Sequence, residues 1–250
     1  MKKKYILPLL ILTGVFVGGV TTIKYNYDNS SNEKSLLNEL SVETYQTHTY
    51  LSSDIIENSQ KATSYAEFVR EFTPEYMLNL ADAVAVVSVI SVDSADTKYN
   101  QAVGNTYGTM VINNSIYGNL TNGTVINYMK SGGTMTLEEY DKYQLPEMRE
   151  KHERLREQSG IDATRVYVNM HFENDPDIEE GKSYLCYLKY IDSIEKYEII
   201  GLGNGFREIN IPQSRSVSSQ SINTSEYKIL NNNTGKFESL SEYINKYINI

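Results

Sequence analysis

The sequence is poor in the residues from which most catalytic and metal sites are built. It has one cysteine, three histidines and no tryptophan among its 250 residues. The lone cysteine, Cys186, excludes an internal disulfide, so the fold must be held together by packing. Three scattered histidines argue against a histidine-rich metal site. We therefore assign no catalytic residue, no metal ligand and no cofactor from the sequence.

Short motifs that resemble known sites each fail at a required position. His152 begins a zinc-protease HExxH motif, but the position of the second histidine holds Arg156. Asp175 and Asp177 alternate like the start of a calcium loop, but the required glycine is missing from the sixth position. The glycine-rich stretch 201–205 lacks the dinucleotide spacing. We interpret the first stretch as a charged helix, the second as a turn between strands and the third as a hairpin turn.

The chain is acidic, with a formal net charge of -9 at pH 7. This charge repels the phosphate backbone of nucleic acids, and no run of basic residues offsets it. Hydrophobic residues make up 40% of the chain, which is typical of a soluble globular body. We expect no nucleic-acid partner, and no membrane span in the body of the chain.

The N-terminus has the features of an export signal. Lysines at positions 2–4 precede an uncharged, mostly apolar stretch over residues 5–23. The lysines should stay in the cytoplasm, and the stretch nearly matches the length of a membrane-spanning helix, although Pro8 weakens it. Residues 1–23 are therefore a signal anchor or a cleaved signal peptide. We expect the rest of the chain outside the cytoplasm, either held at the cell membrane by this single pass or secreted.

Residues 24–61 are rich in asparagine, serine and glutamate and carry only short apolar groups, which predicts a flexible tether. The remaining residues, 62–250, are enough for one domain. Over residues 65–80, apolar side chains recur at spacings of three and four, which indicates a helix interrupted at Pro74.

Short strand-like stretches make up most of the domain. Residues 83–92 form a β-branched run without alternation, which predicts burial on both faces. A turn at residues 119–123 joins two later stretches into a hairpin. This pattern predicts a mainly β (α+β) fold, built as an antiparallel barrel or sandwich. The expected strands cover residues 83–92, 107–116, 124–129, 165–172, 183–191, 197–202 and 206–211.

A charged helical segment, broken at Pro146 and with Gly160 placed to end it, interrupts the strands. We assign it as an insertion over residues 134–160. Met148 and Leu155 lie seven residues apart on one helical face, and Glu150 and Arg154 surround them with charge. These four residues are the candidate binding site, and the insertion is the candidate recognition element for a protein partner. The alternative is a solvated lid without a partner.

The C-terminal residues predict a second helical feature. Ser239 and Glu242 have the spacing of a capping box, and an apolar stripe follows them. We expect a helix over residues 239–250 that docks on the barrel. The serine-rich stretch 213–225 is expected to be a mobile loop.

Several short motifs also resemble a known group of domains. In chain order they are Ala81-Asp82-Ala83, Tyr117-Gly118, Gly123-Thr124-Val125, Gly132-Gly133, Glu180-Gly181-Lys182-Ser183-Tyr184-Leu185, Gly201 and Gly205-Phe206. Together they resemble OB-like β-barrel domains of exported, often membrane-anchored proteins from low-GC Gram-positive bacteria. The layout is also similar to the netrin-like inhibitor barrels, but the N-terminal cysteine and disulfides of those inhibitors are absent. The resemblance implies a fold without implying an activity.

These features favour an extracytoplasmic binding module of the cell envelope, with an envelope protein as its partner. Two alternatives from other classes stay open. Cys186 could serve a sortase-like envelope enzyme, although its apolar strand is typical of a buried core cysteine. The 21 tyrosines could form a glycan-binding face on the barrel, provided that exposed rings cluster on one side.

Overall fold

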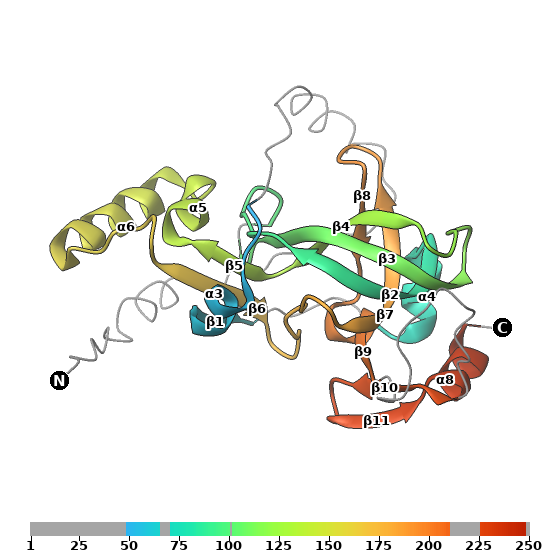
Figure 1. Ribbon diagram of the computed structural model, residues 1–250. Helices are drawn as coiled ribbons and strands as arrows, with labels where there is room; N and C mark the ends of the chain where they lie inside the picture. Colours follow the sequence, from blue (N-terminus) through green and yellow to red (C-terminus); the bar gives the residue numbers. More distant parts are fainter. Residues whose placement is uncertain (1–48, 66–70, 101, 211–225, 249–250) are drawn as a thin grey trace.

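The computed structural model describes residues 49–65, 71–100, 102–210 and 226–248 (Figure 1). The expected export signal over residues 1–23, most of the expected tether and the serine-rich stretch 213–225 lie outside these residues. Within the described part of the chain, no helix has the length and apolar character needed to cross a bilayer. The fold is mainly β with several short helices, as the sequence predicted.

Five strands form a closed barrel. They are β2 (Ala83–Val92), β3 (Asn105–Tyr117), β4 (Val125–Ser131), β7 (Ser183–Ile191) and β8 (Lys196–Ile199). The ring closes because β8 pairs with both β7 and β4. The pairing of β4 with β8 is parallel, whereas the other four pairings in the ring are antiparallel. The expectation of a wholly antiparallel barrel is therefore wrong at its closing pair.

The predicted burial on both faces is confirmed for residues 83–87, where alternation along β2 explains it, but not for the end of the strand, where Ile90 is exposed. Ala83, Ala85 and Val87 point into the barrel core, whereas Val84 and Val86 belong to a second apolar cluster outside the barrel wall. Successive residues of a strand point to opposite faces, so two apolar layers require an uninterrupted apolar run. Register shifts between β2 and β3 accompany the strong curvature that a small barrel needs.

A second, three-stranded sheet stands beside the barrel. Its central strand β6 (Tyr167–Phe172) pairs in parallel with β1 (Gln60–Ser64) and antiparallel with β5 (Gly133–Thr136). The strand expected at residues 165–172 therefore exists, but it lies outside the barrel. Its buried side chains form a separate small core with Met135. Two helices, over residues 137–142 and 146–159, lie between β5 and β6 in the chain. We call the sheet together with these two helices the second-sheet lobe.

The described part of the expected tether, residues 49–61, packs against the body. Leu51 is buried, and its backbone N–H donates to the carbonyl of Val92 at the end of β2. Helix α3 (Ser53–Asn58) follows and packs Ile56 against the barrel core. The chain then enters β1. The tether interpretation is wrong for these residues, because their few apolar side chains find partners that are distant in the sequence.

The C-terminal part extends the sheet beyond β7 through three short strands, β9 (Phe206–Asn210), β10 (Lys228–Asn231) and β11 (Lys236–Ser239). Helix α8 (Leu240–Tyr247) follows, and the backbone N–H of Glu242 donates to the Ser239 hydroxyl as the capping-box spacing predicted. Buried side chains of α8 pack into the second apolar cluster, which confirms the docked helix. Helices α4 (Pro74–Leu80) and α7 (Leu202–Gly205) complete this side of the molecule.

Candidate functional site

The second-sheet lobe carries a helical hairpin that projects from one end of the molecule (Figure 1). Helix α5 (Leu137–Lys142) leaves β5 directly, and helix α6 (Pro146–Ser159) returns toward β6. Pro146 occupies the first turn of α6, and Gly160 ends the helix with a φ of 67°, as the sequence predicted. The insertion of 134–160 has different bounds in the structure, because Thr134 and Met135 are buried in β5.

A buried polar cluster fixes α6 onto α5. Asp141 of α5 accepts a hydrogen bond at 2.6 Å from Nδ1 of His152, and its other carboxylate oxygen pairs with Arg156. The Tyr140 ring stacks on the His152 ring with centroids 6.2 Å apart. We call Asp141, His152 and Arg156 the Asp141 trio. A helical hairpin held by two hydrogen-bonding partners of one carboxylate is preorganised.

His152 is therefore buried, which corrects the expectation that it lies on a solvated charged helix. Burial, and to a lesser extent the Lys151 charge, lowers the pKa of His152. Arg156 balances the Asp141 carboxylate, so the ring is neutral at physiological pH and its Nδ1–H donates to Asp141. Local sequence pattern does not predict this contact, because the two partners lie on different helices.

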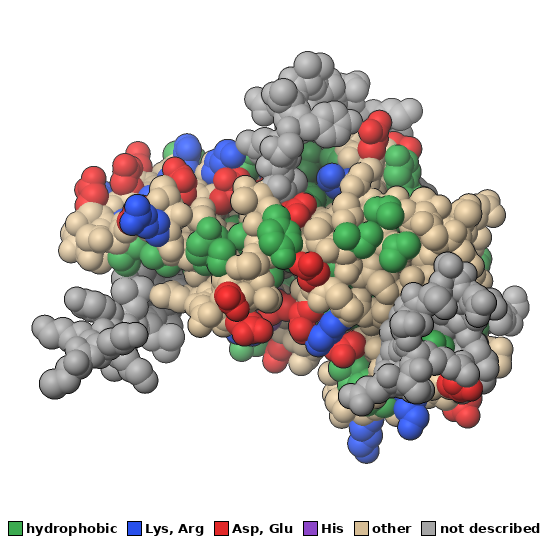
Figure 2. Space-filling view, viewed as in Figure 1, with side chains coloured by type: hydrophobic (Ala, Val, Ile, Leu, Met, Phe, Trp, Pro, Cys, Tyr) green, Lys and Arg blue, Asp and Glu red, His purple; other side chains and the backbone are tan. Residues whose placement is uncertain are grey.

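A charged groove of about 810 Å³ lies between the two helices. Its lining includes four acidic side chains that stand apart from the Asp141 trio, namely those of Glu138, Glu139, Glu150 and Glu153. Two cations, Lys142 and Arg149, also line it, and the Lys142 ammonium pairs with Glu139 at 3.3 Å. Figure 2 shows acidic and basic side chains exposed over this lobe. The groove retains an excess of negative charge.

The four predicted site residues, Met148, Glu150, Arg154 and Leu155, do not face one common site in the structure. Glu150 is exposed and lines the groove, and Arg154 is exposed but does not line it. Met148 and Leu155 are half-buried on the same helical face as His152, so they belong to the inner side of α6. Sequence reasoning missed the acidic residues of α5, although two glutamates directly after the Thr136 cap were a signal of an acidic helix start.

A second polar contact lies where the barrel meets the second-sheet lobe. The Lys130 ammonium and the Asp175 carboxylate form an ion pair at 2.8 Å, and both side chains are almost fully buried. Burial raises the pKa of Asp175, an effect that the Lys130 charge opposes. Asp177 accepts a hydrogen bond from Asn169 at 2.9 Å. The two aspartates of the calcium-like motif are thus engaged by protein groups.

The thiol of Cys186 lies inside the barrel. It is fully buried among apolar side chains, and burial raises its pKa. A thiol in this environment is a poor nucleophile. In the described ranges, no group of three or more His, Cys, Asp or Glu side chains is arranged to hold a metal ion.

The tyrosines of β7 do not share one exposed face. Tyr184 and Tyr187 are buried, whereas Tyr190 is exposed and its ring centroid lies 5.0 Å from that of Tyr197. The β7 rings therefore do not form a shared exposed face of the kind that the glycan alternative assumes. A comparison with protein families and with curated proteins finds no match for this chain.

Proposed function

We propose that the chain is an OB-like, extracytoplasmic binding module of the cell envelope, and that it binds a protein partner through the α5–α6 groove. Three features support an OB-like barrel: five strands, one parallel closing pair, and an inserted helical region between the third and fourth barrel strands. The resemblance to exported Gram-positive barrel domains agrees with this architecture. A barrel of this type can carry functional insertions without changing its core.

The groove between α5 and α6 is the observation that carries this proposal. It lies on a projecting hairpin, and the Asp141 trio holds both helices in one arrangement before any partner arrives. Preorganisation lowers the entropy cost of binding. The excess of carboxylates favours a partner segment that presents lysine or arginine side chains, because complementary charge speeds association and selects the partner.

The experiment measures binding of a short lysine-rich peptide to the full chain by fluorescence anisotropy. Replacing both Glu150 and Glu153 by glutamine should weaken binding by about 5-fold, since each exposed ion pair contributes about 0.2–1 kcal/mol. Higher salt should weaken the wild-type complex as well. The double variant Glu147→Gln, Glu157→Gln is the matched control, because both residues are exposed on the same helix but neither lines the groove.

Failure of the peptide to bind the wild-type chain would reject a cationic partner for the groove. Equal losses in the groove variant and in the double control variant would show that only the net charge of the helix matters. Either result removes the groove as the recognition element.

We also propose that the body lies outside the cytoplasm, attached to the membrane through residues 1–23 or released after cleavage there. The basic triplet and the apolar run that follows it support this location. Protease added to intact cells should digest the body and spare cytoplasmic proteins. Complete protection of the body in intact cells, together with its digestion after lysis, would exclude this topology.

A further inference from the structure

Buried polar atoms without a hydrogen-bond partner gather at the seam between the barrel and the second-sheet lobe. Most proteins pair nearly all such atoms with protein groups or with ordered water. Among the described residues, the unpartnered side-chain atoms at or near this seam are Asn105 Nδ2, Thr134 Oγ1, Asn169 Oδ1, His171 Nδ1 and Asp175 Oδ1. Of the regions that the structure describes, the seam is therefore the one with the most buried polar atoms left for water.

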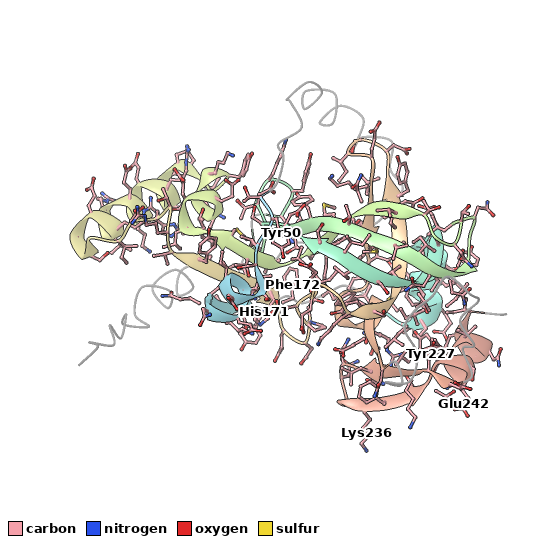
Figure 3. The ribbon with its side chains drawn as sticks, in the orientation of Figure 1. Tyr50, His171, Phe172, Tyr227, Lys236 and Glu242 are labelled. Carbon is pink, nitrogen blue, oxygen red and sulfur yellow. The ribbon has the colours of Figure 1, made fainter. Side chains whose placement is uncertain are left out.

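A small cavity lies in this seam. It offers about 20 Å³ to a water-sized occupant, which is room for one molecule. Thr134 of β5 and His171 of β6 line it from the lobe, and Lys130 of β4 lines it from the barrel. Leu51 and Ile56 of the N-terminal segment also line it, with apolar surface. The labelled His171 lies on β6 beside β1 (Figure 3).

Three polar groups of the lining have hydrogen-bonding capacity left for an occupant. Thr134 is 4% exposed and its hydroxyl has no partner among the described residues. The His171 ring uses Nε2 in a 3.0 Å contact with the Thr63 hydroxyl, which leaves Nδ1. The Lys130 ammonium has three N–H groups and donates to Ser131 and Asp175. Three partners are the usual number for a buried water.

We propose that the cavity binds one structural water molecule, held by Thr134 Oγ1, His171 Nδ1 and the third N–H of Lys130. The groups with capacity left in this lining include a hydroxyl, which donates and accepts, and an ammonium N–H, which donates, so water suits them because it also donates and accepts. The water joins β4 of the barrel to β5 and β6 of the lobe. The water therefore helps to attach the second-sheet lobe to the barrel.

Thr134→Val tests the proposal, because its effect on stability changes sign with the presence of the water. If water is bound, the variant removes one of three partners, and the melting temperature should fall by about 3 °C. If the cavity is dry, valine replaces an unsatisfied hydroxyl by a methyl group, and the melting temperature should stay unchanged or rise. Thr106→Val is the matched control, since Thr106 is buried, lines the same cavity and donates to Gly132 at 2.7 Å.

A second measurement uses the unaltered full chain and does not depend on folding of a variant. Water-selective nuclear Overhauser experiments should show a long-lived contact between water and the backbone amides of Gly133 and Thr134. The proposal is supported if this contact is present and Thr134→Val lowers the melting temperature in the same direction as Thr106→Val. Absence of the contact, or a Thr134→Val chain at least as stable as the wild type, overturns it.

Discussion

The barrel and the second-sheet lobe bury different kinds of side chain. The barrel core consists of aliphatic and aromatic residues together with the Cys186 thiol. The lobe has a much smaller apolar core, and it depends on the Asp141 trio inside the hairpin and on the Lys130–Asp175 pair at the seam. Apolar burial is non-directional, whereas a buried charge requires its partner in one place. The lobe should therefore respond more sharply than the barrel to loss of a single contact.

The largest expected effect is at the seam. Lys130→Met leaves the Asp175 carboxylate buried without its cation, which should lower the free energy of unfolding by about 3–5 kcal/mol. The double variant Lys130→Met, Asp175→Leu removes both charges and should recover most of this loss. Urea unfolding followed by circular dichroism measures both. A loss below about 1 kcal/mol for Lys130→Met would mean that the pair is solvated, and the contrast between the two regions would fail.

A smaller and more local effect is expected in the hairpin. Asp141→Ala leaves His152 and Arg156 without their carboxylate, which should destabilise the packing of α6 by about 1–3 kcal/mol. Hydrogen exchange should then become roughly 10-fold faster or more for α6 amides while the β2 amides keep their protection. Glu157→Ala, on the exposed side of α6, is the control. Equal acceleration in α6 and β2 would show that barrel and hairpin unfold as one unit.

The smallest expected effect concerns Glu198 in the barrel wall. It tests whether burying this carboxylate lowers the stability of the barrel. Burial raises the pKa of Glu198 on β8, and Lys189 opposes the shift. Because the folded-state pKa lies above the ordinary value of 4.5, the folded chain binds the proton more tightly, and stability falls as pH rises from that value through the raised pKa. Glu198→Gln should remove this fall and stabilise the chain at pH 7 by less than about 1 kcal/mol. Thermal melts between pH 4 and pH 7 measure the difference, and parallel curves for variant and wild type would contradict it.

The same contrast explains how much the sequence could predict. The barrel strands carry long β-branched or apolar runs, so the bounds of residues 83–92 and 183–191 and the burial of Cys186 follow from local pattern. The short strands β1, β5, β10 and β11 were missed. They have only four or five residues each and carry no long apolar run, and non-local partners supply their pairing.

The candidate site was predictable only in part. The helical insertion and its break at Pro146 were visible, because proline and charge patterning act locally. The inward position of His152 was not visible, because it depends on a carboxylate eleven residues earlier on another helix. Met148 and Leu155 were assigned to the candidate binding site from their shared helical face, and the structure places them half-buried on the same face as His152. Periodicity identifies the apolar face of a helix but not what covers that face.

The parallel pairing of β4 with β8 also bears on how the chain reaches its native state. Between these two strands the chain must pass through β5, both hairpin helices, β6 and β7. Contacts between residues that are distant in the sequence slow folding, because the chain loses loop entropy before the contact forms. The pairing of β4 with β8 is thus a non-local contact, as is the pairing of β2 with β7 in the same ring. Most of the lobe, namely β5, both helices and β6, lies within the loop that the β4–β8 pairing closes, so its compactness influences the rate of folding as well as the shape of the folded protein.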